Sequence, residues 1–104
     1  MIVLTIDNVP GREIAEALGI VEGEIVQTKH IGNDLLAGLK TIVGGEVKGY
    51  TDMMEQARKV STERMIEQAT KLGADAIIGV KYSSSEIMQG ASEILAYGTA
   101  VKLK

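Results

Sequence analysis

The side chains that could bind a metal ion in this chain are few. Histidine occurs once, at His30, and the 104 residues include no cysteine, which excludes disulfides, iron–sulfur clusters and thiolate zinc sites. The candidate oxygen ligands are Glu24 and Asp34. One imidazole per chain falls short of the about four ligands that zinc takes. A metal site therefore requires an oligomer that repeats His30, Glu24 and Asp34, with hard or histidine ligands.

The same residues also have structural explanations. Asp34 lies at the start of an expected helix, where the helix dipole favours an anion by about 0.3–1 kcal/mol. A lone histidine within the segment Lys-His-Ile-Gly-Asn is typical of an exposed or capping residue. Both explanations stay open beside the metal hypothesis.

Other chemistries have weaker signals. Met53 and Met54 are adjacent, so on a helix they would point about 100° apart and could not easily meet at one ion. Methionine is expected instead to fill a core that has three tyrosines and no other aromatic residue. Segment 44–51 spaces its glycines like a phosphate-binding loop, but Tyr50 stands where that loop needs lysine. The sequence has no Gly-x-Ser-x-Gly elbow that would indicate a serine nucleophile.

Apolar periodicity predicts the order strand, strand, helix, helix, strand, strand. The strands are expected at 2–6, from Leu18 to about Thr28, at 76–82 and at 93–103, with a polar hairpin loop at Ser83–Ser92. The helices are expected at 33–43 and 51–72, the second ending at Gly73 in a left-handed cap. This order indicates the α+β class: one two-layer domain over residues 1–104 with an antiparallel sheet and two helices.

Two positions predict close approaches between elements. In the last strand, Ala96, Gly98 and Ala100 share one face and leave room for another backbone or a helix. Gly23 predicts a bulge or a close backbone approach in its own strand.

Composition excludes several function classes. The net charge is -3, so the chain lacks the basic surface that binds nucleic acid. No apolar run reaches the roughly 20 residues of a membrane span, and no export signal is visible, so we expect a cytoplasmic protein. A thin aliphatic core in a chain of this size makes a homo-oligomer a reasonable expectation.

Several short motifs together resemble one known family. They are Gly23-Glu24, Asp34, Ala37-Gly38, Ile42-Val43-Gly44-Gly45, Tyr50, Leu72-Gly73-Ala74-Asp75-Ala76, Gly79-Val80 and Gly98-Thr99-Ala100-Val101. From about Gly23 to Val101 the chain resembles the YbjQ-like family, small bacterial and archaeal proteins catalogued as heavy-metal-binding. The resemblance implies an α+β subunit of dodecin-like type that assembles into a ring, typically a homopentamer. It implies no reaction.

Three functions stay open, in descending order of preference. The first is an oligomeric binding protein that holds a metal ion or small ligand at subunit interfaces. The second is a structural or partner-recognition ring without a ligand. The third is an enzyme that uses carboxylates such as Glu24, Asp34 and Asp75 in an interface cleft.

Overall fold

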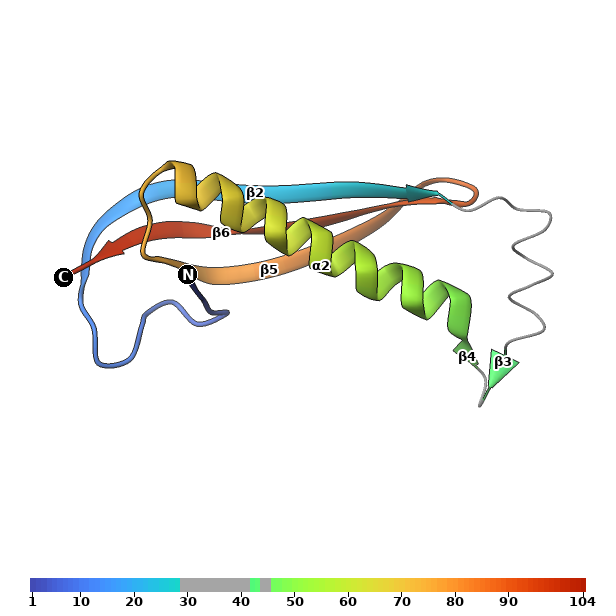
Figure 1. The fold of residues 1–104 in the computed structure, drawn as a ribbon, viewed down its shortest axis with the longest axis horizontal. Coiled ribbons are helices and arrows are strands. Elements are labelled where there is room, and N and C mark those ends of the chain that lie inside the picture. The colour runs from blue at the N-terminus through green and yellow to red at the C-terminus, as the bar shows by residue number, and fades with distance from the viewer. Residues whose placement is uncertain (29–41, 44–45) are drawn as a thin grey trace.

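One helix lies along one face of a four-stranded sheet in the computed structural model, which describes residues 1–28, 42–43 and 46–104 (Figure 1). The main sheet has the strand order β1-β5-β6-β2, and a separate pair is formed by β3 and β4. The elements are β1 (Ile2–Val3), β2 (Ile14–Thr28), β3 (Ile42–Val43), β4 (Glu46–Val47), α2 (Lys48–Lys71), β5 (Ala76–Met88) and β6 (Ala91–Leu103).

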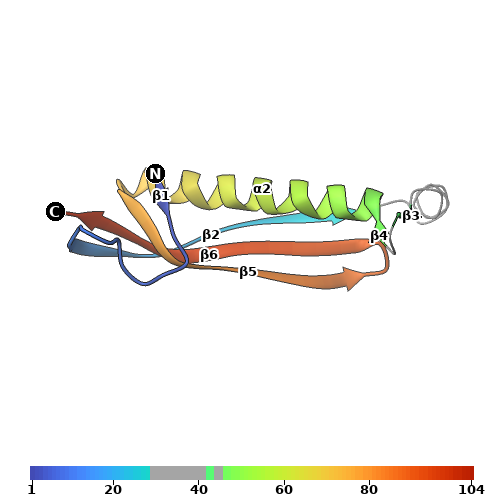
Figure 2. The ribbon, with the colours of Figure 1, turned by 90° about the horizontal axis from the view of Figure 1, so that it is seen from below.

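The three long strands form the body of the sheet. β6 lies in the centre, antiparallel to β2 on one side and to β5 on the other, while the short β1 runs parallel to β5. Because opposite residues in an antiparallel ladder share a face, the register assigns each side chain to the helix side or to the far side. Figure 2 shows the helix above this sheet for most of its length.

The main core lies between α2 and the sheet. Met65 and Ala69 of the helix are fully buried against Val21 of β2 and against Ala96 and Ala100 of β6. The sequence predicted that the small residues of the last strand share one face. This prediction is confirmed, because Ala96 and Ala100 both face this core. The helix ends as predicted at Gly73, whose φ is 77° and whose N–H donates to the Thr70 carbonyl oxygen.

Gly23 is where helix and sheet come closest. A Cβ atom at this position would overlap the backbone oxygen of Ser61 and the backbone nitrogen of Met65. The close approach predicted for Gly23 is therefore confirmed, and its partner is the helix backbone itself. Gly98 is crowded differently: a Cβ there would lie 2.8 Å from Cγ2 of Ile77 on the neighbouring strand.

A second, smaller core lies on the far face of the sheet. Val9, from the segment that follows β1, is buried against Ala76, Ile78 and Val101. The N-terminal segment thus covers this part of the far face. The register places a further stretch of that face beyond this cover.

Two parts of the predicted fold are wrong. The sheet is mixed rather than antiparallel, because β1 pairs in parallel with β5. The described residues contain one helix instead of two: most of the helix expected at 33–43 lies outside the described residues, and Ile42–Val43 at its end form strand β3. The class α+β nevertheless holds. Consecutive β-branched and apolar residues suit a strand as well as one helix face, so periodicity over so short a stretch could not separate the two.

The predicted hairpin loop is also wrong. Instead of a loop over Ser83–Ser92, β5 continues to Met88 and β6 begins at Ala91. Serine is a common turn residue, which favoured a loop, but here the cross-strand ladder with β6 keeps the serines extended. The strands project far from the core, and the radius of gyration is 17.0 Å. A compact chain of about 100 residues has a value of about 13 Å.

Candidate functional site

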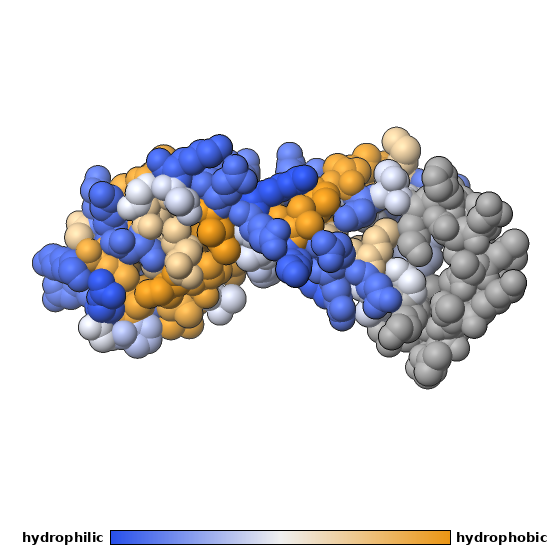
Figure 3. All heavy atoms as spheres, viewed as in Figure 1, coloured by the Kyte–Doolittle hydropathy of each residue, from blue (hydrophilic) through white to orange (hydrophobic). Residues whose placement is uncertain are grey.

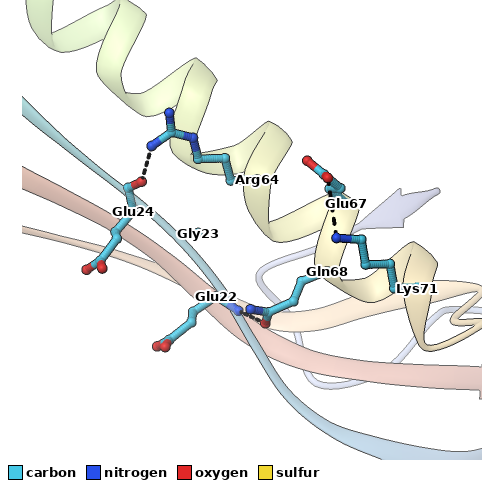
Figure 4. Close-up of a pocket in the computed structure, with 7 residues that line it drawn as sticks. All are labelled: Glu22, Gly23, Glu24, Arg64, Glu67, Gln68 and Lys71. Atoms are coloured by element: carbon cyan, nitrogen blue, oxygen red, sulfur yellow. Dashed lines mark hydrogen bonds and ion pairs between the residues drawn. The ribbon is translucent and has the colours of Figure 1, made fainter.

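A shallow hollow of about 340 Å³ lies between α2 and the outer edge of β2 (Figure 4). Its lining residues are Glu22, Gly23, Glu24, Arg64, Glu67, Gln68 and Lys71. The closeness of helix and strand at Gly23 creates it, because long side chains on the next helical turns then extend over the strand edge. The hollow carries charges of both signs.

Two helix side chains bind the backbone of this strand edge. Nη1 of Arg64 donates to the carbonyl oxygen of Glu24 at 2.7 Å, and Oε1 of Gln68 accepts from the N–H of Glu22 at 2.9 Å. A strand at the edge of a sheet normally presents such groups to solvent or to another chain. Arg64 and Gln68 therefore occupy part of the β2 edge.

The carboxylates of the hollow do not converge. Figure 4 shows those of Glu22 and Glu24 directed away from the helix, while Glu67 faces Lys71 in an exposed ion pair of 3.5 Å. Such exposed pairs contribute little, with a median of about 0–1 kcal/mol. The hollow is thus a polar surface and has no pair of carboxylates arranged for acid–base catalysis.

The structure locates one of the three predicted metal ligands. Glu24 lies on β2, with its side chain exposed, whereas His30 and Asp34 lie outside the described residues. Among the described residues there is no group of three or more histidine, cysteine, aspartate or glutamate side chains that could hold a metal ion.

Asp75, the other carboxylate considered for catalysis, has a structural partner. Its Oδ2 accepts from the backbone N–H of Leu103 at 2.9 Å, as expected for an aspartate at a strand entrance. Glu24 pairs with Leu95 on β6, eight residues from Leu103. At about 3.3 Å per residue, this separation is roughly 26 Å, so one chain does not bring Glu24 and Asp75 together.

The far side of the sheet has a stretch that no other part of the described chain covers, which we call the open face. It begins at Ile20 and Thr99 and runs outward; its members are Ile20, Glu22, Glu24, Val26, Lys81, Ser83, Ser85, Glu93, Leu95, Tyr97 and Thr99. Ile20 is 77% exposed and Val26 is 51% exposed. At its inner end a hollow of about 290 Å³ is lined by Asp7, Ile20, Gly79, Lys81, Tyr97, Gly98 and Thr99.

Arg64, Gln68 and the open face were missed by the sequence analysis. Charged and amide residues on an outer helix face are ordinary, so nothing in the sequence separated Arg64 and Gln68 from their neighbours. Alternation in 93–103 did indicate which residues share a face with Tyr97. It did not indicate how far the N-terminal segment would extend over that face.

Together these features define a small α+β protein whose described residues form one helix on one side of a long sheet, with polar hollows at the surface. Comparison with known proteins identifies the group. The chain belongs to the YbjQ family, described as "Putative heavy-metal-binding", whose sequence model matches residues 1–104. The resemblance found in the sequence motifs is thereby confirmed.

The chain is similar to proteins that carry only a provisional family name. A UPF0145 protein of Vibrio parahaemolyticus is 60% identical over 103 residues, covering 99% of this chain and 98% of the relative. A UPF0145 protein of Thermotoga maritima is 58% identical over 104 residues, covering 100% and 98%. Both likenesses extend over almost the whole length of the relatives.

The fold is also found in a solved structure. It is the crystal structure of a protein of unknown function from Pediococcus pentosaceus, assigned to the DUF74 family. The likeness covers 100% of this chain and 98% of that one, with a TM-score of 0.68 and 19% identity. Within the part of our chain that the structure describes, no helix is long and apolar enough to cross a membrane.

Proposed function

We propose that this protein is an oligomeric binding protein whose copies assemble into a ring, in line with the pentamer that the family resemblance implies. The observation that carries this proposal is the open face. Nothing in the described chain covers it, although it exposes Ile20 and Val26 and places Leu95 and Tyr97 beside them. Burying such apolar surface between copies would stabilise an assembly by about 25 cal/mol of free energy per Å².

The elongated shape supports the same proposal. Strands that extend far from the core bury little surface in one chain, and small domains are already marginal in this respect. Contacts between copies would add the missing burial, and cyclic closure leaves no unpaired interface.

We further propose that the ligand, a divalent metal ion or a small molecule, binds between subunits. Glu22 and Glu24 stand on the open face, and assembly would bring copies of Glu24 near other subunits. Glu24, His30 and Asp34 are the proposed metal ligands. Carboxylate and imidazole ligands suit hard or borderline ions rather than a soft heavy metal, because the chain has no thiolate.

Light scattering after size exclusion tests the assembly. We expect a mass near five times 11.1 kDa at micromolar concentration. A monomer mass under these conditions would contradict the proposed function. The cytoplasmic location expected from the sequence remains part of the proposal.

Calorimetric titration with zinc, copper and nickel tests the ligand. We expect weak binding by the assembled wild type and at least tenfold weaker binding by His30→Ala, Asp34→Asn and Glu24→Gln. Glu63→Gln, on the exposed side of α2, is the matched control and should bind like the wild type. Tight binding that survives all three substitutions would show that other residues are the ligands.

A ring without a ligand is the second candidate function. If no metal binds, and native mass spectrometry of the protein purified from cells finds no small molecule, the assembly itself would be the function. The exposed apolar residues of the open face favour this candidate equally.

A further inference from the structure

The two long edges of the sheet differ in a way that selects one of them for assembly. The sheet ends at β2 on one side, and on the other side at β5 beyond the short β1. On the β2 side, Arg64 and Gln68 bind outward-facing backbone groups of Glu24 and Glu22. The difference between the edges depends on the partners of the β5 backbone groups that point away from β6.

The ladder shows which residues of β5 point outward. Along an antiparallel strand, the backbone N–H and C=O groups of successive residues alternate: those of one residue bond to the neighbouring strand, and those of the next point away from it. The backbone N–H of Glu22 bonds to Gln68, so the backbone groups of Glu22 point away from β6. Tyr97, the partner of Glu22 on β6, therefore directs its own backbone groups to the other side, toward β5. Tyr97 pairs with Lys81 there. The outward residues of β5 are therefore the alternate ones, Tyr82, Ser84 and Glu86.

These outward groups have no partner in the described chain. β1 pairs with β5 at Ala76 and Ile77, and the last backbone bonds from the N-terminal segment reach Gly79 and Val80. Beyond Val80, no described strand adds to this edge. The edge also carries exposed apolar residues: Tyr82 is 46% exposed, Ile87 50% and Met88 65%.

On the helix side, apolar and polar residues together surround the β5 edge. A small hollow of about 90 Å³ separates it from α2, lined by Met54, Arg58, Tyr82, Ser83, Ser84 and Ile94. The hydroxyl groups of Tyr82 and Thr62 lie 2.8 Å apart at this point. Figure 3, which shows the helix side, has hydrophobic residues at the surface on both sides of a hydrophilic band.

We infer that a second copy of this chain adds a strand to β5 at Tyr82–Glu86, and that Arg64 and Gln68 keep β2 from serving as the same kind of edge. This inference rests on the proposed assembly and names the edge through which it occurs. Main-chain hydrogen bonds would supply the affinity, as in other additions of a strand to an open edge. With one open and one partly occupied long edge, each subunit accepts one strand at β5, which opposes unlimited sheet growth.

Two proline variants separate the edges. Ser84→Pro removes an outward N–H from β5, and Thr28→Pro, in the same alternating set as Glu22 and Glu24, removes an outward N–H from β2. Neither N–H bonds to β6, so both variants keep the ladder within the chain. We expect Ser84→Pro to run at monomer mass in light scattering, with association at least tenfold weaker, and Thr28→Pro to keep the wild-type mass. Circular dichroism verifies that each variant is folded.

The outcomes are distinct. A monomeric wild type refutes the proposed function. An oligomeric wild type together with an oligomeric Ser84→Pro, or with equal dissociation of both variants, refutes the inference about β5 and leaves the proposed function intact.

Amide hydrogen exchange on the wild type gives a test that needs no variant. We expect slow exchange at Tyr82, Ser84 and Glu86 in the oligomer, although these N–H groups have no described partner within one chain. Fast exchange at all three in the oligomer would overturn the inference.

Discussion

The carbonyl oxygen of Glu24 accepts a 2.7 Å hydrogen bond from Nη1 of Arg64, a residue 40 positions further along the chain. This bond joins the edge of β2 to the outer side of α2. It is possible because Gly23, next to Glu24, lets the helix backbone approach the strand. One glycine thus determines both the packing distance and the reach of the Arg64 side chain.

Arg64→Ala is expected to lower the free energy of unfolding by about 0.5–1.5 kcal/mol, the range of one hydrogen bond exposed to solvent. Urea denaturation monitored by circular dichroism measures this change. Lys59→Ala, an exposed cation on the same helix, is the control and should change stability by less than about 0.5 kcal/mol. Equal effects of the two substitutions would mean that the bond to Glu24 contributes nothing.

Gly23→Ala is expected to destabilise the protein more than Gly98→Ala. At Gly23 the added carbon meets helix backbone, which cannot rotate away, whereas at Gly98 it first meets the Ile77 side chain. Overpacking typically lowers the free energy of unfolding by about 1–3 kcal/mol. Because the helix backbone near Gly23 is rigid, we expect the loss for Gly23→Ala to lie at or above the upper end of this range. Thermal unfolding of the two variants ranks them. The reverse order would show that α2 shifts readily on the sheet.

Gly98→Val is expected to be disruptive, as the face of small residues around Gly98 predicts. The branched side chain must displace Ile77 and Val80, whose Cγ2 atoms lie 2.8 and 3.0 Å from the Cβ position. We expect a loss of at least about 2 kcal/mol in the free energy of unfolding. A variant that melts like the wild type would contradict the crowding at this position.

Met65→Ala is expected to cost about 2–5 kcal/mol, because Met65 is fully buried in the main core and its removal leaves a cavity. Met88→Ala is the matched control: the same substitution at a methionine that is 65% exposed should change stability by less than about 0.5 kcal/mol in the monomer. Calorimetric melting of both variants checks the difference. Similar losses would refute the core assignment.

Asp75→Ala is expected to destabilise the protein by about 1 kcal/mol, since the N–H of Leu103 loses its acceptor. Asp75→Asn keeps an oxygen at this position and should lose less. Chemical denaturation compares the two. If both variants match the wild type, the bond between Asp75 and Leu103 has no net effect on stability.

The sequence by itself determined the family, the α+β class and most local structure. The long helix, expected at 51–72 and found at 48–71, its end at Gly73 and the alternating faces of β6 follow from periodicity and from glycine's access to positive φ, which are properties of nearby residues. The absence of cysteine likewise limits the candidate metal ligands to carboxylates and a single imidazole.

Only the tertiary structure decided which edges and faces are covered. The parallel pairing of β1, the extended serines of β5 and the bonds of Arg64 and Gln68 to β2 all join residues far apart in the chain. Serine is common in turns and arginine on exposed helix faces, and neither local preference reveals such partners. Their conformation is selected by backbone groups that must find hydrogen bonds across the sheet, and that selection depends on the whole fold.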